Sequence, residues 1–131
     1  MAATEIRNYM TPNPRSVPRS STVRSAIQLM EKQHIRHLVV TDGGALVGLV
    51  SRRELDLLSM VSGFETDKTP VEMAMTPEPY AVPPATPLKT LARNMAAAKI
   101  GSAVIVENGK PVGIFTTIDA LLALSDCAPG E

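Results

Sequence analysis

The stretch MTPNPRSVP at Met10–Pro18 recurs as MTPEPYAVP at Met75–Pro83, 65 residues further along the chain. The same shift continues on both sides without a gap. When positions 4–58 are set against positions 69–123, 14 of the 55 pairs are identical. A gapless match of this length predicts two copies of one structural unit, with little of the chain outside them.

The length of 131 residues favours a pair of small halves over a solenoid, because solenoids usually need three or more repeats. Each half has about 60 residues, which is close to the lower limit for an independent core. The halves are therefore expected to pack on each other as a pseudo-twofold pair. The predicted parts are a first repeat at 4–61, a polar linker at 62–69, a second repeat at 70–124 and a tail at 125–131.

Composition excludes several classes of function. The 13 Lys and Arg residues balance 13 Asp and Glu residues, whereas nucleic-acid binders normally carry a basic excess. No uncharged apolar run reaches the ~18 residues that span a bilayer, and Met1–Tyr9 is too polar for a signal peptide. A single Cys127 excludes an intrachain disulfide and a cysteine-based metal site. We therefore expect a cytoplasmic protein that binds neither nucleic acid nor membrane.

A proline-rich extended start and two apolar strands are predicted in each repeat. Asn108-Gly109 lies between two apolar runs and predicts a tight hairpin, since both residues tolerate positive φ, and Asp42-Gly43-Gly44 occupies the same place in the first repeat. The runs hold few polar residues, so the strands should be buried on both faces. The predicted bounds are 11–18 and 76–84 for the extended starts, and 37–41, 46–50, 102–106 and 111–115 for the strands.

Two helices are predicted in each repeat. The first helix should run over 22–33 with Ser20 or Ser21 as its cap, and its counterpart should have Thr86 as the cap and Pro87 as the first helical residue. The second helices are predicted at 53–60 and 118–124. Apolar residues at helical spacing predict one buried stripe on each first helix: Val23, Ala26, Ile27 and Met30, then Leu88, Leu91, Ala92 and Met95.

No set of residues suited to catalysis is visible. His34 and His37 lie three residues apart without further ligands nearby, whereas a zinc site needs three or four, so structural or surface roles are expected for both. The chain has no Walker loop and no Gly-x-Gly-x-x-Gly sequence. The sequence therefore predicts a protein that is not an enzyme and needs neither a metal nor a cofactor.

The segment GIFTTID at Gly113–Asp119 is the best candidate for a binding site. Thr116 should stand where a buried strand turns into a helix, with Asp119 in the first turn of that helix. A carboxylate can accept hydrogen bonds from both hydroxyls of a ribose, and free amides at a helix start favour anions. The same two residues also fit a capping box, in which the acid reaches back to the helix start. The residues alone leave both interpretations open.

Two copies of an extended start, a helix, two strands and a Gly-x-x-Thr/Ser-x-x-Asp ending resemble a pair of cystathionine β-synthase (CBS) domains, often called a Bateman module. The resemblance covers about residues 4–124. It implies an α/β (α+β) fold of two β-α-β-β-α repeats about a pseudo-twofold axis. It also implies clefts between the copies that bind AMP, ADP, ATP or S-adenosylmethionine as regulatory ligands, and a role in regulating a partner protein.

Carried over residue by residue, the resemblance implies one favoured cleft. Thr116 and Asp119 would bind the ribose there, while Ser21 and Arg36 would supply polar or phosphate contacts. For Ala26 and Ile35 the alternative is a place in the core, and for Arg36 it is a solvated surface charge. The full predicted set is Val17, Ser21, Ala26, Ile35, Arg36, Ile114, Thr116 and Asp119.

The second cleft departs from the family pattern, because Glu54 replaces the aspartate after Ser51. The longer side chain puts the fit to a ribose in doubt. Leu91 is also bulkier than its counterpart Ala26 and could crowd an adenine, so one ligand per chain is predicted before two. Arg52 and Arg53 could bind phosphate or simply be exposed. The predicted set is Ser51, Glu54, Thr86, Leu91, Ile100 and Gly101.

The sequence leaves two functions open. The first is a stand-alone regulatory module that binds an adenosine-containing ligand and modulates an unknown protein. The second is a ligand-free module for dimerisation or protein interaction, which the apolar second helices at 55–61 and 120–124 favour. The resemblance implies a homodimer through those helices.

Overall fold

The computed structural model describes residues 4–127 and divides into two compact units. The continuous unit is residues 15–79, and the split unit combines residues 4–14 with residues 80–127. Each unit holds one four-stranded sheet and two α-helices, so the fold is of the mixed α/β class. The division does not follow the sequence repeats, because the start of each repeat belongs to the unit that holds the rest of the other repeat.

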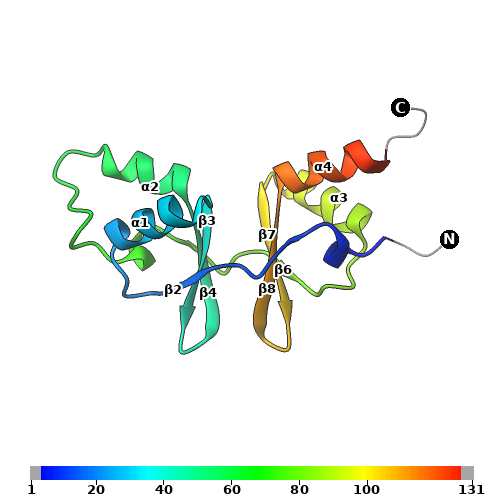
Figure 1. Cartoon of the computed structure of the whole chain (residues 1–131), viewed down its shortest axis with the longest axis horizontal. Helices are drawn as coiled ribbons and strands as arrows, with labels where there is room; N and C mark the ends of the chain where they lie inside the picture. The colour runs from blue at the N-terminus through cyan, green and yellow to red at the C-terminus, as the bar shows by residue number, and fades with distance from the viewer. Residues whose placement is uncertain (1–3, 128–131) are drawn as a thin grey trace. The chain divides into compact units, whose positions relative to one another are not determined.

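In the continuous unit the strand order is β2-β3-β4-β5, with β2 parallel to β3 and the other neighbours antiparallel. Both α-helices cover the same face of this sheet (Figure 1). The elements in chain order are β2 (Ser16–Pro18), α1 (Val23–Gln33), β3 (His37–Asp42), β4 (Ala45–Ser51), α2 (Arg52–Ser59), the 3-10 helix η2 (Val71–Met73) and β5 (Thr76–Pro77).

The split unit repeats this plan with the strand order β1-β8-β7-β6. Its sheet pairs β6 with β7 in parallel, and β8 runs antiparallel to both β7 and β1. Both of its α-helices again lie on one face of the sheet (Figure 1). The elements are the 3-10 helix η1 (Ile6–Asn8), β1 (Thr11–Pro12), β6 (Ala81–Val82), α3 (Leu88–Ala98), β7 (Ser102–Glu107), β8 (Lys110–Thr116) and α4 (Thr117–Cys127).

Each unit has a core between its sheet and its helices. Val23, Ala26 and Met30 bury the predicted stripe of α1 against the strands, and Leu91 and Met95 do the same for α3. Three consecutive residues are buried in the middle of β3 and again in β7, which confirms that these strands are covered on both faces. The four predicted strands are therefore correct, and each is slightly longer than expected.

The hairpin turns form as predicted. Asn108 and Gly109 have φ of 54° and 78°, so both residues of the turn are left-handed, as a two-residue hairpin of the primed type requires. Gly43 and Gly44 have φ of 59° and 89° at the same place in the other unit. A β-branched residue at any of these positions would be strained.

The predicted caps of the first helices were wrong. α1 begins one residue later than expected, and its cap is Thr22, whose side chain accepts a hydrogen bond from the amide of Ser25 at 3.1 Å. Ser21 is instead held in a turn, with its amide donating to Pro18 O at 3.0 Å. In α3 the cap position is Pro87, which has no side chain to accept a hydrogen bond, and Leu88 is the first helical residue.

The free amides at these helix starts are bound by backbone from the other repeat. The amide of Leu88 donates to Thr4 O at 2.7 Å, and the amide of Val23 donates to Thr69 O at 2.8 Å. Thr4 and Thr69 are 65 residues apart, as are Val23 and Leu88, so the exchange is reciprocal. This pairing explains why α3 needs no capping side chain. It also gives a role to residues 62–69, which the sequence suggested as a linker.

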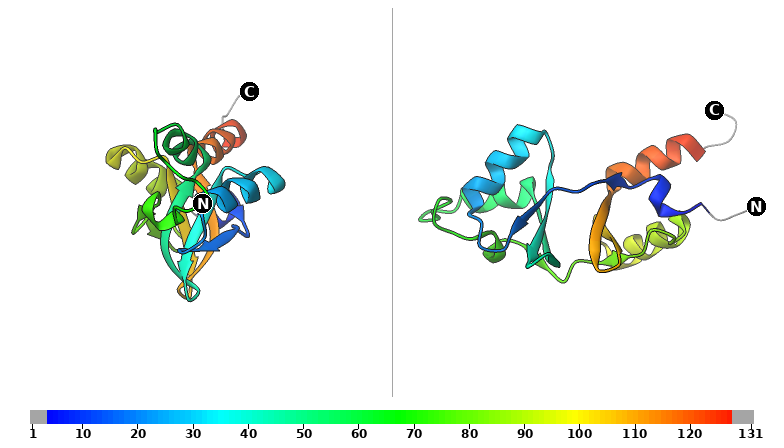
Figure 2. Two further views of the ribbon diagram at one scale, coloured as in Figure 1. Left: turned by 90° about the vertical axis from the view of Figure 1, so that its left-hand side faces the viewer. Right: turned by 60° about the horizontal axis from the view of Figure 1, so that its bottom comes forward.

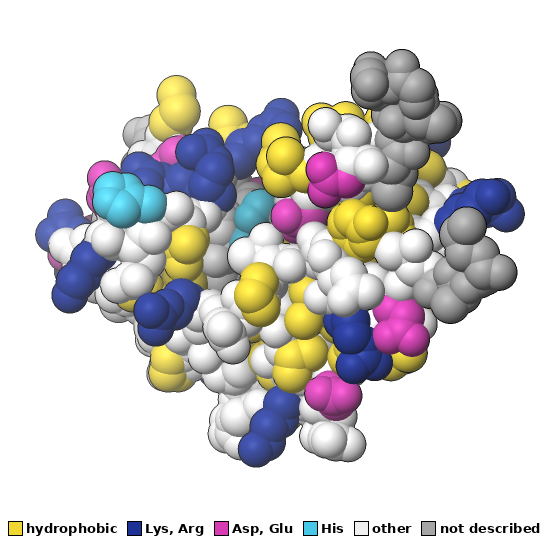
Figure 3. Space-filling view, turned by 45° about the vertical axis from the view of Figure 1, so that its right-hand side comes forward, with side chains coloured by type: hydrophobic (Ala, Val, Ile, Leu, Met, Phe, Trp, Pro, Cys, Tyr) yellow, Lys and Arg dark blue, Asp and Glu magenta, His cyan; other side chains and the backbone are white. Residues whose placement is uncertain are grey.

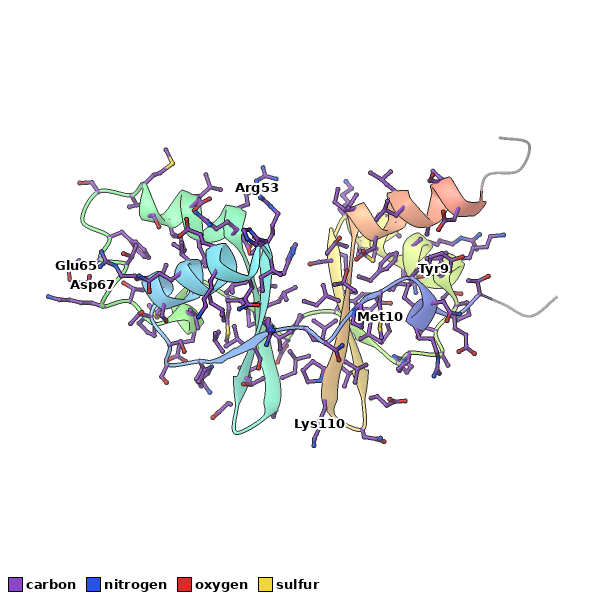
Figure 4. All side chains as sticks on the ribbon, in the orientation of Figure 1. Tyr9, Met10, Arg53, Glu65, Asp67 and Lys110 are labelled. Carbon is purple, nitrogen blue, oxygen red and sulfur yellow. The ribbon has the colours of Figure 1, made fainter. Side chains whose placement is uncertain are left out.

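The Met-Thr-Pro segments follow the same exchange. β1 pairs with β8, with Thr11 opposite Ile114, and β5 pairs with β4, with Thr76 opposite Leu49. The side chain of Met10 lies over Gly113, beside β8 in Figure 4, where a Cβ atom would come within 2.3 Å of its sulfur. Met75 lies over Gly48 in the same way, at 2.2 Å. Figure 2 shows the blue start of the chain leading from the split unit into the continuous unit.

The second helices begin one residue earlier than predicted, at Arg52 and Thr117. α4 is also longer than expected, because it continues to Cys127 and so includes the first part of the predicted tail. The rest of that tail, residues 128–131, lies outside the described residues.

Candidate functional site

Thr116 and Asp119 lie together at the junction of β8 and α4. The amide of Thr116 donates to Asp119 Oδ2 at 3.0 Å, and the Thr116 hydroxyl approaches the same oxygen at 3.4 Å. The aspartate therefore reaches back to the helix start, as the capping interpretation predicted. Both residues are half-buried, so a ligand could still reach the carboxylate.

A third residue that the sequence did not suggest completes this group. The hydroxyl of Thr11 donates to Asp119 Oδ1 at 3.1 Å and lies 3.4 Å from Oδ2, although the two residues are 108 positions apart. The antiparallel pairing of β1 with β8 brings Thr11 to this place. The repeat marked Thr11 as a recurring residue of the extended start, but nothing in the pattern indicated its partner.

Ser51 and Glu54 form a full capping box at the start of α2. The amide of Glu54 donates to Ser51 Oγ at 3.2 Å. In return, Glu54 Oε1 accepts from the amide of Ser51 at 3.2 Å and from its hydroxyl at 3.0 Å. The carboxylate is thus turned back onto its own helix start. This geometry stabilises the start of α2.

The structure places the apolar residues of the predicted sites mostly in the cores. Ala26 and Leu91 have no exposed surface, so in this structure neither side chain has a surface on which a ligand could lie. Val17 and Ile114 are each 7% exposed, and Ile35 is half-buried against the core of the continuous unit. The difference in size between Ala26 and Leu91 therefore affects core packing first.

Two polar residues predicted for the favoured site, Ser21 and Arg36, lie on the continuous unit. Ser21 is half-buried, and its carbonyl accepts from the amide of Val71 at 2.7 Å. Arg36 is exposed just before β3, and its carbonyl accepts at 2.8 Å from the amide of Arg52, the first residue of α2. Among the described residues, Arg36 forms no ion pair.

Three more residues of the weaker set lie on the split unit. Gly101 and Ile100 are exposed just before β7, and Thr86 is half-buried before α3. The carbonyl of Gly101 accepts from the amide of Thr117 at 3.1 Å and from its hydroxyl at 3.3 Å. The start of α4 is thereby held against the start of β7.

The arginines at the start of α2 differ in their partners. Arg52 donates to Asp56 Oδ1 at 2.8 Å and lies 3.8 Å from Glu31 Oε2. The hydrogen bond to Asp56, followed by the charges of Asp56 and Glu31, raises the pKa of Arg52 above its ordinary value. Arg53 is exposed at the same helix start (labelled in Figure 4) and pairs with no other described residue. A cation is unfavourable near a helix N-terminus, so Arg53 is a candidate to bind an anion.

An apolar surface lies on the helices of the split unit. A groove of about 890 Å³ runs along α3 and α4, and its lining includes Leu88, Ala92 and Ala123. Yellow hydrophobic side chains are visible at the surface in Figure 3 beside acidic ones in magenta. Four apolar residues of α4 are each more than half exposed: Ile118, Leu121, Leu122 and Leu124.

Two features are absent from the described residues. Residues 4–127 contain no helix long and apolar enough to cross a membrane. Within the same range, no group of three or more His, Cys, Asp or Glu residues is placed to hold a metal ion.

Comparison with known proteins agrees with this architecture. An uncharacterized conserved protein from Pyrococcus horikoshii is 35% identical, with a TM-score of 0.82 and coverage of 94% of each chain. CBSX2, whose crystal structure is a complex with AMP, is 29% identical, with a TM-score of 0.79 and coverage of 95% of this chain and 98% of its own.

The CBS domain-containing protein YhcV from Bacillus subtilis (strain 168) is 26% identical over 114 residues, which are 87% of this chain and 81% of YhcV. Residues 5–58 and 71–126 each match the CBS domain family, and no catalytic family is indicated. The chain therefore belongs to the CBS domain family and carries two copies of the domain.

Proposed function

We propose that this chain is a regulatory module that binds an adenosine-containing ligand through Thr116 and Asp119 and thereby modulates a partner protein. The observation that carries the proposal is the hydrogen bonding of Asp119. Its carboxylate is half-buried and oriented by Thr11 and Thr116, and Oδ1, which accepts from Thr11, has a second lone pair for a ligand. CBSX2, a relative of this chain, was solved with AMP, which supports the choice of ligand class.

The proposed chemistry is recognition of a ribose. Two neighbouring hydroxyls can each donate to one oxygen of the Asp119 carboxylate, and such charge-assisted hydrogen bonds are worth ~1.5–3 kcal/mol. The Thr116 hydroxyl and the start of α4 would contact a ribose or phosphate oxygen. The candidates are AMP, ADP, ATP and S-adenosylmethionine.

Calorimetric titration of the purified chain with these four compounds tests the proposal. Asp119→Ala should weaken binding by roughly ten- to a hundredfold, because it removes the two strongest hydrogen bonds to the ribose. Glu54→Ala is the matched control in the other repeat, and it should leave the affinity for the first ligand unchanged. Absence of both heat and a thermal shift with all four compounds would refute the proposal.

The roles proposed for Ser21 and Arg36 need a separate comparison. Arg36→Ala should lower the affinity for ATP more than that for adenosine if its guanidinium contacts phosphate. Arg24→Ala is a suitable control, since Arg24 is also exposed on the continuous unit and its guanidinium forms no ion pair with another described residue. Equal losses for ATP and adenosine would mean that Arg36 does not contact phosphate.

A second function, homodimerisation through the second helices, is favoured by the apolar surface of α4. Its four exposed residues are too many to leave in water without a partner. Replacing Leu121 and Leu122 with Asp should convert a dimer to a monomer in light scattering. Met73→Asp is the control, because Met73 is 73% exposed and belongs to η2 of the continuous unit. A wild-type chain that is monomeric at micromolar concentration would contradict this function.

A further inference from the structure

The side chain of Thr11 contacts Asp119, in addition to the backbone pairing of β1 with β8. Its hydroxyl donates to Asp119 Oδ1 at 3.1 Å, while the amide of Thr116 donates to Oδ2 at 3.0 Å. The hydroxyls of Thr11 and Thr116 also lie 3.4 Å from Oδ2, and donors on both oxygens fix the rotation of the carboxylate plane. A carboxylate oxygen has two lone pairs, and Oδ1 accepts from Thr11 with one of them, so the other can accept from a ligand.

The other repeat shows that the Met-Thr-Pro segment does not require this contact for folding. Thr76 occupies the equivalent place, pairs with Leu49 in the same antiparallel register, and is exposed. Among the described residues, Thr76 donates no hydrogen bond to Glu54, whose carboxylate is turned onto Ser51. The strand pairing is thus common to both units, whereas the bond from hydroxyl to carboxylate belongs to the split unit alone.

We propose that Thr11 is the positioning residue of Asp119, which makes the ligand site of the second repeat depend on residues 4–14 of the first. This inference rests on the function proposed above. Without the Thr11 hydroxyl, only Thr116 at the start of α4 holds the carboxylate, as only Ser51 holds Glu54 in the other repeat, and the oxygen that faced Thr11 is free to move. The ligand then has to reorder the carboxylate, and affinity falls.

The coupling runs in both directions. If the docked Thr11 favours the ligand, the ligand must favour the docked segment by the same factor. The amide of Asn13 is a natural probe, because it donates to Val112 O at 3.2 Å directly after β1. Its counterpart is the amide of Glu78, which donates to Val47 O at 3.4 Å.

The first experiment needs no ligand. Amide hydrogen exchange is measured for the whole chain in the wild type and in Asp119→Ala and Glu54→Ala. Loss of one hydrogen bond to a charged group should speed exchange at Asn13 about three- to tenfold in Asp119→Ala. Glu54→Ala should leave exchange at Glu78 unchanged. Equal exchange at Asn13 in the wild type and Asp119→Ala would overturn the inference.

The second experiment measures affinity for whichever of the four adenosine compounds binds best. Thr11→Val keeps the shape of the side chain and should weaken binding about three- to tenfold, whereas Thr11→Ser should restore it. Thr76→Val is the matched control and should bind as the wild type does. Equal affinities for Thr11→Val and Thr76→Val would overturn the inference while leaving the proposed function intact.

Failure of the proposed function has a different signature. If the wild type binds none of the four compounds, the function is wrong and the exchange at Asn13 alone decides whether Thr11 positions Asp119. The positioning role also predicts that Thr11→Val and Thr76→Val have equal unfolding midpoints in urea. A lower midpoint for Thr11→Val alone, without rescue of affinity by Thr11→Ser, would show a structural role and refute the positioning role.

Discussion

One methylene group separates the carboxylates that end the two repeats, and it changes what each can do. Glu54 is long enough to accept from both the amide and the hydroxyl of Ser51, so its carboxylate serves the helix. Asp119 is shorter and accepts from both the amide and the hydroxyl of Thr116, but it also takes a donor from Thr11. The sequence could predict that the two sites differ, because the exchange of Asp for Glu is visible in it.

Asp119→Glu should give the second repeat the geometry of the first. The longer side chain would close a capping box on Thr116, so the unfolding free energy should stay within about 0.5 kcal/mol of the wild type. Affinity for the adenosine ligand should nevertheless fall at least about tenfold, since the longer carboxylate would leave the position that Thr11 gives it. Calorimetry and urea unfolding measure both quantities. An Asp119→Glu variant that binds normally would show that side-chain length does not separate the two sites.

At the scale of elements, short helices depend on their first turn. α2 has only eight residues, and a helix of this length is marginal without a stabilised end. Ser51→Ala should therefore lower the free energy of unfolding by about 0.5–2 kcal/mol, measured by urea titration. Ser20→Ala is the control, because Ser20 is exposed and outside any helix. Equal stability of the two variants would mean that the capping box contributes nothing measurable.

The contacts between methionine and glycine join each extended start to a strand. Gly113→Ala would bring a Cβ atom within 2.3 Å of the Met10 sulfur, so the side chain must move, and we expect a loss of about 1–3 kcal/mol. Part of that loss should be recovered in the double variant with Met10→Ala, which removes the clash. Gly101→Ala is the control, since its Cβ would meet only Thr117 Oγ1 at an ordinary 3.5 Å. Strictly additive effects of the two changes would contradict this contact.

At the scale of the whole molecule, the sequence predicted the repeats, strands and hairpins, because period, turn residues and apolar runs are local signals. It could not predict the exchange of starting segments. β4 and β8 offer the same backbone hydrogen bonds to a Met-Thr-Pro segment. The local pattern of residues therefore does not say with which of the two strands each segment pairs. The helix caps were predicted wrongly for the same reason. The backbone carbonyls of Thr4 and Thr69, which are distant in sequence, accept hydrogen bonds from amides at the helix starts, where a local capping side chain was expected.

Fragments cut by the units should therefore fold better than fragments cut by the repeats. Residues 15–79 keep β5 and the carbonyls of Thr66 and Thr69, which accept the first amides of α1. Residues 4–61 lose all of these. We expect a cooperative urea transition for the fragment 15–79 and none for 4–61, measured by circular dichroism. A cooperative transition of 4–61 alone would contradict the importance of the exchanged segments.

The pairing of β1 with β8 also fixes an order of events during synthesis. Thr11 is made 103 residues before Ile114, the residue that it faces. At ~5–20 residues per second, the ribosome needs roughly 5–20 s to supply that partner. The continuous unit is complete well before then. Residues 4–14 thus leave the ribosome long before the strand that they pair with, and Asp119 acquires its threonine partner only after β8 has been made.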